Sequence, residues 1–425
     1  MNKLWLSRLQ NFSLWLVVFL IPWQARYFYY NDRLNNQAYE LGQLGWYLSA
    51  GLIIIAWLLW LPRIKRPRYF WTIGGLVLAW VGLSINWAPH PWLTLYYGSL
   101  VILATLFWLI TRSADGVLML RALVWSGGVQ AILALYQFST QFITANSWLG
   151  IAEHDPHVAG QSVIIFHGIR LLRSYGVMPH PNMLAGFIAI SIIALWLLSL
   201  RRVPSTMKFH LLWCGLSSLL YLGLLVTFSR AALIALLAAW LILWFATHHR
   251  GFISARSMLH YGIVLGIAIV LLVNFTNQGI LLQRWDSYDR LEQISIQERL
   301  SGWTQWNQVM QTRPERWLIG VGPYNYLPAL AQTYTHLPIW AYQPVHNIYA
   351  LLIAEWGLAG IIIIISLIAW VFTRIRHRHW DILAAASPLI ALALMGLVDH
   401  WIITSYSGLL LVALSLGLVR HKVYN

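Results

Sequence analysis

The sequence predicts an all-helical integral membrane protein. The 425 residues are 59% hydrophobic and only 10% charged, whereas soluble domains are about 45–50% apolar and about 25% charged. Apolar runs long enough to cross a hydrocarbon core, about 20 residues each, recur along the chain between polar segments. Because these runs are continuously apolar rather than alternating, they indicate helices and exclude the strands of a membrane β-barrel.

The apolar runs predict about twelve membrane-spanning helices. We see no internal repeat and no linker long enough to separate domains, so residues 1–425 are expected to form a single polytopic membrane domain. The expected spans cover residues 4–24, 45–62, 69–87, 93–111, 116–137, 182–200, 209–227, 230–247, 257–275, 347–372, 382–399 and 402–419.

The distribution of lysine and arginine predicts the orientation of the bundle. If the N-terminus is cytoplasmic, every lysine and most arginines fall in inner loops, as the positive-inside rule requires. Both termini are then cytoplasmic. The formal net charge of +15 is mostly this orientation signal, together with attraction to anionic lipid, and does not indicate nucleic-acid binding.

Two outer loops, 138–181 and 276–346, are much longer than the other connections, and long loops are usually functional. Apolar side chains recur at helical intervals among charges over 285–303, which predicts one or two amphipathic helices on the membrane surface. Every outer-loop cation is an arginine. Because a guanidinium matches phosphate oxygens, these arginines suggest a phosphate-bearing ligand.

Four segments carry a family resemblance. They read RSYGVMPHPNMLAG at 173–186, LLVTFSRAALIAL at 224–236, ERLSGWTQWNQVM at 298–310 followed by GVGPYNY at 320–326, and VHNIYALLIAEWGLAG at 345–360. In this order and topology they resemble the O-antigen ligase and O-antigen polymerase superfamily. The preceding part of the chain resembles it only in topology.

The resemblance implies a GT-C type glycosyltransferase of lipopolysaccharide biosynthesis in the bacterial inner membrane, with a periplasmic active site. Its donor would be a glycan on undecaprenyl diphosphate. A ligase would use lipid A-core as acceptor, a polymerase another lipid-linked repeat unit, and a protein O-oligosaccharyltransferase a Ser or Thr. The chain length, the twelve expected spans and the single dominant late loop favour the ligase, and the short C-terminal tail argues against the protein-modifying enzyme. A non-enzymatic transporter or flippase is disfavoured because the polar residues gather at one face.

His346 is the expected catalytic base. A neutral imidazole accepts a proton near neutral pH, and the helix N-terminus that follows it disfavours the charged ring. The alternative is that His346 merely caps this helix beside Asn347. The resemblance assigns diphosphate or substrate binding to Arg173, Arg230 and Arg299. Their alternatives are headgroup contact for Arg230 and ordinary loop salt bridges for the other two, for instance with Glu298 or Asp289.

Supporting roles are expected for His180, which fixes the PHPN turn, for Asn182 as the cap of the sixth span, and for Asn347. Asp399 could orient His346 as the acid of a His-carboxylate pair. The EHDPH stretch at 153–157 could bind a cation, but its spacing matches no closed ligand set, so we expect a solvated loop and neither metal nor cofactor. One base without a paired outer carboxylate predicts transfer with inversion.

Overall fold

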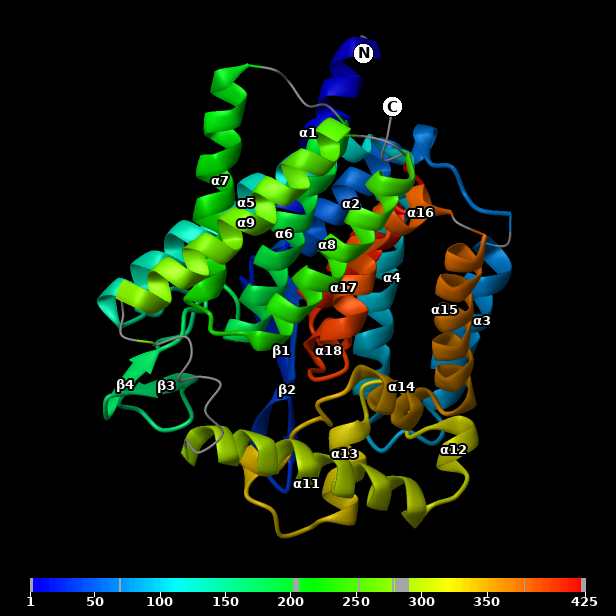
Figure 1. The fold of residues 1–425 in the computed structure, drawn as a ribbon. Coiled ribbons are helices and arrows are strands. Elements are labelled where there is room, and N and C mark those ends of the chain that lie inside the picture. The colour runs from blue at the N-terminus through cyan, green and yellow to red at the C-terminus, as the bar shows by residue number, and fades with distance from the viewer. Residues whose placement is uncertain are drawn as a thin grey trace.

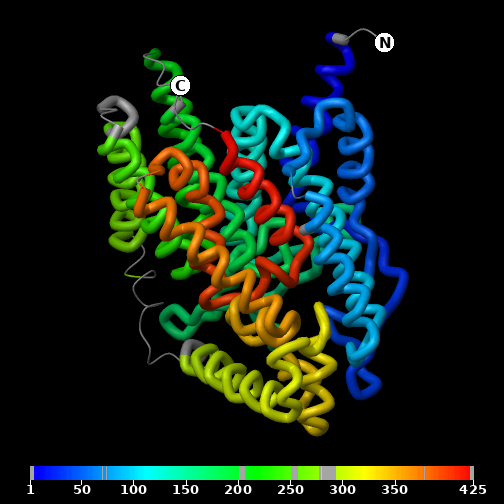
Figure 2. The backbone as a smooth tube through the Cα atoms, turned by 90° about the vertical axis from the view of Figure 1, so that its right-hand side faces the viewer, coloured from blue at the N-terminus to red at the C-terminus, as the bar shows by residue number. Residues whose placement is uncertain are grey.

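The computed structural model describes residues 3–68, 70–201, 206–250, 253–276, 279, 290–377 and 379–421. The helices form one bundle, and the two ends of the chain lie at the same end of it, at the top of Figure 1. A second layer of elements lies across the opposite end, as Figure 2 also shows. This lower layer consists of α11 (Arg290–Thr312), α12 (Arg316–Ile319), α13 (Tyr326–Thr333), η2 (Ile339–Ala341) and α14 (Ile348–Trp356).

Within the described part of the chain, seven helices are long and apolar enough to cross a membrane. The prediction of a helical membrane protein is therefore confirmed, whereas the expected number of about twelve spans is not. The seven are α4 (Pro91–Ser113), α5 (Gly116–Thr140), α6 (Pro181–Arg201), α7 (Met207–Leu225), α8 (Arg230–Arg250), α9 (Ile253–Thr276) and α15 (Leu358–Arg376). Shorter helices complete the bundle: α1 (Lys3–Phe19), α2 (Leu48–Trp60) continued by η1 (Leu61–Arg63), α3 (Phe70–Ser84) and α19 (Tyr406–Leu418).

Helix α6 forms the centre of the core. It is apolar on every side, and a helix of this kind is stable only when other elements surround it. Helices α5, α7, α8 and α9 pack around it, together with α17 (Ser387–Met395). Helix α15 is the opposite case, because Gly360 is its one buried residue and its isoleucines face outward. Outward-facing apolar side chains suit contact with lipid.

The apolar run 347–372 was expected to be one span, and this prediction is wrong. It divides into α14 and α15 at Gly357, whose φ is +56°. The loop before α13 packs against the end of α14. The Val321 N–H donates to the Ala354 carbonyl at 2.8 Å, and the Gly322 N–H donates to the Glu355 carbonyl at 3.1 Å. A side chain at Gly357 would collide with backbone atoms of Leu318 and Gly320.

The last two expected spans, 382–399 and 402–419, are also interrupted. The short helix α16 (Trp380–Ala385) is followed by α17, which ends at Met395, and α18 (Trp401–Thr404) precedes α19. The chain between Gly396 and His400 is therefore not helical. This break leaves Asp399 and His400 facing the lower layer rather than continuing a helix.

Two antiparallel hairpins were not predicted. They are β1 (Arg26–Leu34) with β2 (Gln37–Tyr47), and β3 (Val163–Phe166) with β4 (Ile169–Leu172). The missed signal for the first is the Asn35-Asn36 pair, where both residues have positive φ, as a tight hairpin turn requires. Two-stranded sheets have unpaired edges, so both hairpins belong outside the hydrocarbon region.

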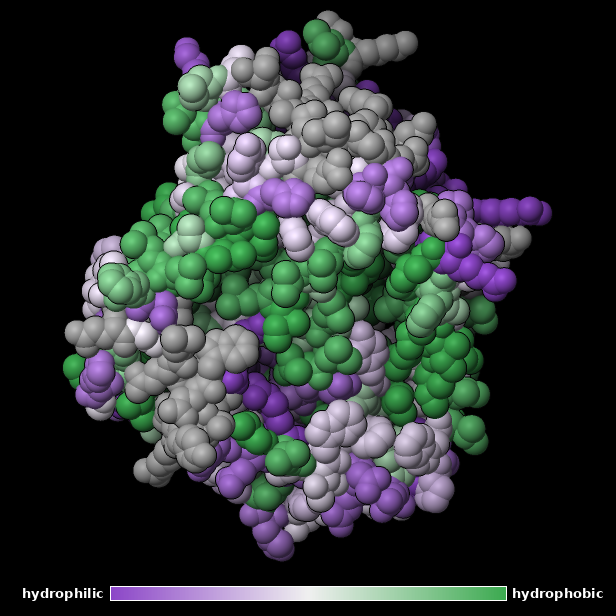
Figure 3. Space-filling model, viewed as in Figure 1, coloured by the Kyte–Doolittle hydropathy of each residue, from purple (hydrophilic) through white to green (hydrophobic). Residues whose placement is uncertain are grey.

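The surface follows the same division. On the face drawn in Figure 3, an apolar band crosses the helices, with hydrophilic residues above and below it. A strongly hydrophilic recess opens below the apolar band and above the lower layer. Polar chemistry at this recess would lie directly beside the lipid-facing surface.

Candidate functional site

The residues of the candidate site come from segments far apart in the sequence. Arg173 follows β4, and Asn182 lies in the first turn of α6. Asp399 lies in the break between α17 and α18, and His346 directly precedes α14. Packing of α17 against α6, and of α11 against α14, brings these four positions to one end of the bundle.

A hydrogen-bonded relay runs through Asn182. The Arg173 Nη2 donates to Asn182 Oδ1 at 2.7 Å, and Asn182 Nδ2 donates to Asp399 Oδ2 at 2.8 Å. The Arg173 Nε also donates to the Thr227 carbonyl at 2.7 Å. Asn182 was expected to cap α6, and the structure differs: its side chain instead joins a cation on one side to a carboxylate on the other.

His180 caps α6 in place of Asn182. Its Nδ1 accepts the Asn182 N–H at 3.1 Å, and its Nε2 lies 3.0 Å from the Ser162 hydroxyl oxygen. An accepting Nδ1 places the proton of the neutral ring on Nε2. Burial and the nearby Arg173 guanidinium lower the pKa of His180 to about 3, so the ring stays neutral. Its contacts position the PHPN turn and leave no free lone pair for proton transfer.

His346 is arranged differently, because its neighbour performs the capping. The Asn347 Oδ1 accepts the N–H groups of Tyr349 at 3.0 Å and Ala350 at 2.9 Å, and its Nδ2 donates to the Leu397 carbonyl at 2.9 Å. Within the described residues the His346 ring makes no hydrogen bond, so the alternative that His346 itself caps the helix has no support here. A half-buried imidazole that makes no hydrogen bond to any described residue is available to a ligand.

Charges on both sides of His346 influence its protonation. Burial lowers the pKa of His346, the Asp399 carboxylate opposes this shift, and the Arg299 guanidinium reinforces it. The His346 ring stacks on that of His400, with centroids 5.2 Å apart and planes inclined by 21°. The net effect favours the neutral ring, which is the form that can accept a proton.

His400 is held in a defined tautomer. Its Nδ1 lies 2.9 Å from the Thr404 hydroxyl oxygen, and that hydroxyl donates to the His400 carbonyl at 3.2 Å. The Nδ1 therefore carries the proton, and Nε2 keeps its lone pair. Burial lowers the pKa of His400 to about 4.

Asp399 accepts on both carboxylate oxygens, from Asn182 and from the His400 N–H at 2.8 Å. Burial alone would raise the pKa of Asp399, but the hydrogen bonds from Asn182 and from the His400 N–H stabilise the carboxylate and hold its pKa below the ordinary value. The carboxylate is therefore ionised. It lies close to His346, but no hydrogen bond joins the two side chains within the described part.

One group of side chains could hold a metal ion among the residues that the structure describes. The ligand atoms of His346, Asp399 and His400 all lie within 4.8 Å of one another. Both Asp399 oxygens already accept hydrogen bonds, and the charges of Arg299 and Arg173 act on the same cluster. These features suit an anionic ligand better than an additional cation.

Arg299 reaches the site from α11. A Cβ at Gly302 would lie 3.9 Å from the Cα of Val345, so α11 passes close to the residue before His346. Arg299 lies about one helical turn before Gly302 in α11. The Arg299 Nε is buried and has no hydrogen-bond partner among the described residues. The expected alternative, a salt bridge with Glu298, is not formed, and Asp289 lies outside the described residues.

Arg230 begins α8, three residues after Thr227, whose carbonyl holds Arg173. The two arginines therefore share one corner of the site. Phe228 lies between Thr227 and Arg230 and has a φ of +52°. This conformation is unusual for a bulky residue and is of the kind found at functional turns.

The EHDPH stretch forms a loop with internal contacts. His154 Nδ1 lies 2.6 Å from Gln161 Oε1, and the ring stacks on Tyr175 with centroids 3.9 Å apart. Asp155 accepts the His157 N–H at 2.8 Å. Within the described residues this stretch contributes to no group of side chains that could hold a metal.

Sequence reasoning missed residues that hold the site in place. Gln137 in α5 accepts the N–H groups of Tyr175 at 3.0 Å and Gly176 at 2.8 Å, and donates to the Gly176 carbonyl at 2.7 Å. It thereby fixes the chain directly after Arg173. A glutamine within an apolar span is the signal that could have identified it. Thr404, which orients His400, carried no comparable signal.

Glu355 also has a positioning role. It is buried, and its backbone carbonyl accepts the Gly322 N–H at 3.1 Å. Glu355 therefore fastens the GVGPYNY loop to α14 and thus stabilises the support of His346.

Residues 214–365 match the family model described as O-antigen ligase. This segment is similar to the O-antigen ligase family. The match covers the turn before Arg230, the Arg299 helix and the His346 segment, and it confirms the resemblance seen in the sequence. No curated protein matches the chain. The O-antigen ligase family indicates a glycosyltransferase-like enzyme of ligase or polymerase type.

Proposed function

We propose that the protein is an O-antigen ligase that transfers a glycan from undecaprenyl diphosphate to lipid A-core at the periplasmic face of the inner membrane. The observation that carries this proposal is the pairing of His346 with Arg299: among the residues that the structure describes, the His346 ring makes no hydrogen bond and the buried Arg299 Nε has no hydrogen-bond partner. The two side chains offer a proton acceptor and an anion site at one end of the bundle. A polymerase with the same donor is the alternative.

The position of the recess suits a lipid-linked donor. A polyprenyl chain is apolar, and its diphosphate and glycan are polar. The hydrophilic recess lies directly below the apolar band of the helices (Figure 3), so a donor could keep its tail in lipid while its head group enters the recess. A soluble nucleotide sugar would have no need of this arrangement.

The proposed reaction begins with the acceptor hydroxyl. Neutral His346 accepts its proton as the hydroxyl oxygen attacks the anomeric carbon of the donor. The bond from the anomeric carbon to the diphosphate oxygen breaks, and its electrons leave with undecaprenyl diphosphate. Arg299 and Arg230 stabilise the negative charge that develops on the departing group. Arg173 contributes from the same corner as Arg230, where its link to Asn182 and Asp399 fixes its direction.

We further propose that transfer inverts the anomeric configuration. Asp399 is occupied by Asn182 and His400, so it is not poised as a nucleophile for a covalent glycosyl intermediate. Direct displacement by the acceptor is then the available route. Nuclear magnetic resonance of the product should show the opposite anomer to the donor, and a product with the donor's configuration would contradict the proposal.

The proposal also assigns charge stabilisation to arginine rather than to a metal. Treatment with EDTA should leave the rate of transfer unchanged, because guanidinium groups already stabilise the negative charge of the diphosphate that a metal cation would otherwise stabilise. Loss of transfer on EDTA treatment, with recovery on addition of Mg²⁺ or Mn²⁺, would instead assign His346, Asp399 and His400 to a metal centre.

The deciding experiment uses proteoliposomes that contain an undecaprenyl-diphosphate glycan. Lipid A-core and excess lipid-linked repeat are supplied as competing acceptors to the wild type, His346→Ala and Arg230→Ala. Transfer to lipid A-core that both substitutions abolish supports the ligase. Growth of glycan on the lipid carrier would make the protein a polymerase, and no transfer by a folded wild type would favour a transporter.

A further inference from the structure

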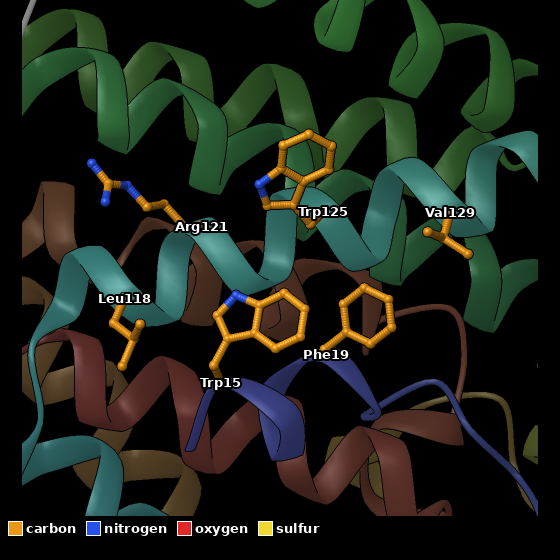
Figure 4. A pocket seen from close by; sticks show the side chains of 6 residues that line it. All are labelled: Trp15, Phe19, Leu118, Arg121, Trp125 and Val129. Atoms are coloured by element: carbon orange, nitrogen blue, oxygen red, sulfur yellow. The ribbon is translucent and has the colours of Figure 1, made fainter. Parts of the chain in front are cut away.

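A pocket that none of the candidate site residues lines opens between α1 and α5. It has a volume of about 410 Å³, and its lining residues are Trp15, Phe19, Leu118, Arg121, Trp125 and Val129 (Figure 4). The four α5 residues recur at intervals of three or four and therefore share one face of the helix. The pocket is a groove with an apolar wall along a membrane-spanning helix.

Side-chain contacts join the two helices that form the groove. The rings of Trp15 and Phe19 stack at 4.9 Å with planes inclined by 15°. At its base the Ser126 hydroxyl donates to the Phe19 carbonyl at 2.6 Å, which fixes α1 against α5. Trp125 and Val129 are each about half exposed, so the groove is open to the lipid. A groove of this form suits an acyl chain.

Arg121 is the charged member of the lining. It lies within a candidate membrane span, about 8 Å along the helix from its start at Gly116. The side chain is exposed, and among the described residues it has neither a hydrogen bond nor an ion pair. An unpaired guanidinium at this depth is costly unless it reaches an anion at the membrane interface. Figure 4 shows it toward the Leu118 end of the groove, with Val129 at the other end.

We propose that this groove binds one anionic phospholipid of the adjacent leaflet, with its phosphate on Arg121 and an acyl chain along Trp125 and Val129. The order of the lining residues matches a lipid, because the cation lies toward the helix end and the apolar side chains follow toward the membrane centre. The charge bias of the loops predicts that this is the cytoplasmic leaflet. The site does not depend on the proposed glycosyl transfer.

Native mass spectrometry of the delipidated full chain tests the proposal, with phosphatidylglycerol and phosphatidylcholine added separately. The wild type should retain one phosphatidylglycerol in preference to phosphatidylcholine. Arg121→Gln should bind phosphatidylglycerol roughly fivefold more weakly, the effect of one cation near the membrane surface. Arg63→Gln, which removes an exposed cation at the same end of the bundle, should bind like the wild type.

Two further variants keep the test decisive if Arg121→Gln fails to fold. Arg121→Lys retains the charge and should keep the preference for phosphatidylglycerol. Val129→Trp fills the groove and should weaken binding of both lipids. Equal binding of the two lipids by the wild type, or unchanged binding by folded Arg121→Gln or Val129→Trp, would overturn the proposal.

Discussion

At His346 a carboxylate and a guanidinium act on one imidazole from opposite sides. Burial and Arg299 lower the pKa of His346, and Asp399 raises it. A base must be unprotonated to work, so the acid limb of the pH profile reports this balance. Because the net shift is downward, the wild-type acid limb should lie below the ordinary imidazole value of about 6.5.

Two variants should move this limb in opposite directions. Asp399→Asn removes the negative charge, disfavours the imidazolium and should move the acid limb to lower pH. Arg299→Gln removes the positive charge and should move it to higher pH. The measurement is kcat/KM against pH with a lipid-linked donor. Identical pH profiles in all three proteins would show that the titrating group is not His346.

Removal of the base itself should have the largest effect of a single substitution. His346→Gln keeps the size of the side chain and cannot accept the proton in the same way, so kcat should fall by about 10²–10⁴. His336→Gln is the matched control, because His336 is exposed in the same outer loop. A folded His346→Gln protein with more than about a tenth of wild-type kcat would exclude general-base catalysis by this residue.

Arg299 should be distinguishable from other arginines of its loop. Arg299→Gln leaves no cation for the diphosphate and should reduce kcat/KM by about 10²-fold or more. Arg313→Gln, at an exposed position shortly after α11, should retain wild-type kcat/KM. Equal losses in both variants would indicate that α11 contributes only general positive potential.

At the scale of the elements, the crossing of the Gly320 loop over Gly357 is the most constrained point. Gly357→Ala places a Cβ against the Leu318 carbonyl and the Gly320 N at a φ of +56°. It should reduce the free energy of unfolding by about 2–4 kcal/mol. Gly215→Ala, in a helix with open space around it, should have little effect or stabilise slightly. Thermal unfolding in detergent measures both.

The helical bundle could be predicted because long apolar runs have few alternatives in a membrane. The interruption at Gly357 could not, because it depends on a loop that crosses from a distant part of the sequence. Helix α11 was expected from its spacing of apolar residues, and it begins at Arg290 as described, whereas Trp285 and Tyr288 lie outside the described residues. Local periodicity predicts elements, whereas contacts between them decide where they end.

The site residues could be predicted from the sequence, but the contacts between distant site residues could not. His346 and Arg299 were found because each lies in a segment that resembles the family. The contact of Asn182 with Asp399 was not foreseen, because it joins positions 217 residues apart. Neither residue lies in the part that matches the family model. Residue chemistry suggests which groups take part, and the fold alone shows which of them meet.

For the whole molecule, the charge bias predicts that the lower layer faces the periplasm. In a Cys214→Ser background, His336→Cys should react with a membrane-impermeant maleimide in spheroplasts. Arg63→Cys, an exposed position at the other end of the bundle, should react only after the membrane is permeabilised. The reverse pattern would invert the topology and place the candidate site in the cytoplasm.

The β1–β2 hairpin has a consequence for biogenesis. Its tip at Asn35 donates to the Thr335 carbonyl at 3.3 Å and to the Tyr342 hydroxyl at 3.0 Å, across 300 and 307 residues. A ribosome releases the hairpin early, yet its docking partners are translated only after most of the helices have been inserted. The first extramembrane piece to emerge is therefore among the last to dock, and a chain that stalls before residue 335 leaves an unsecured hairpin for proteases to detect.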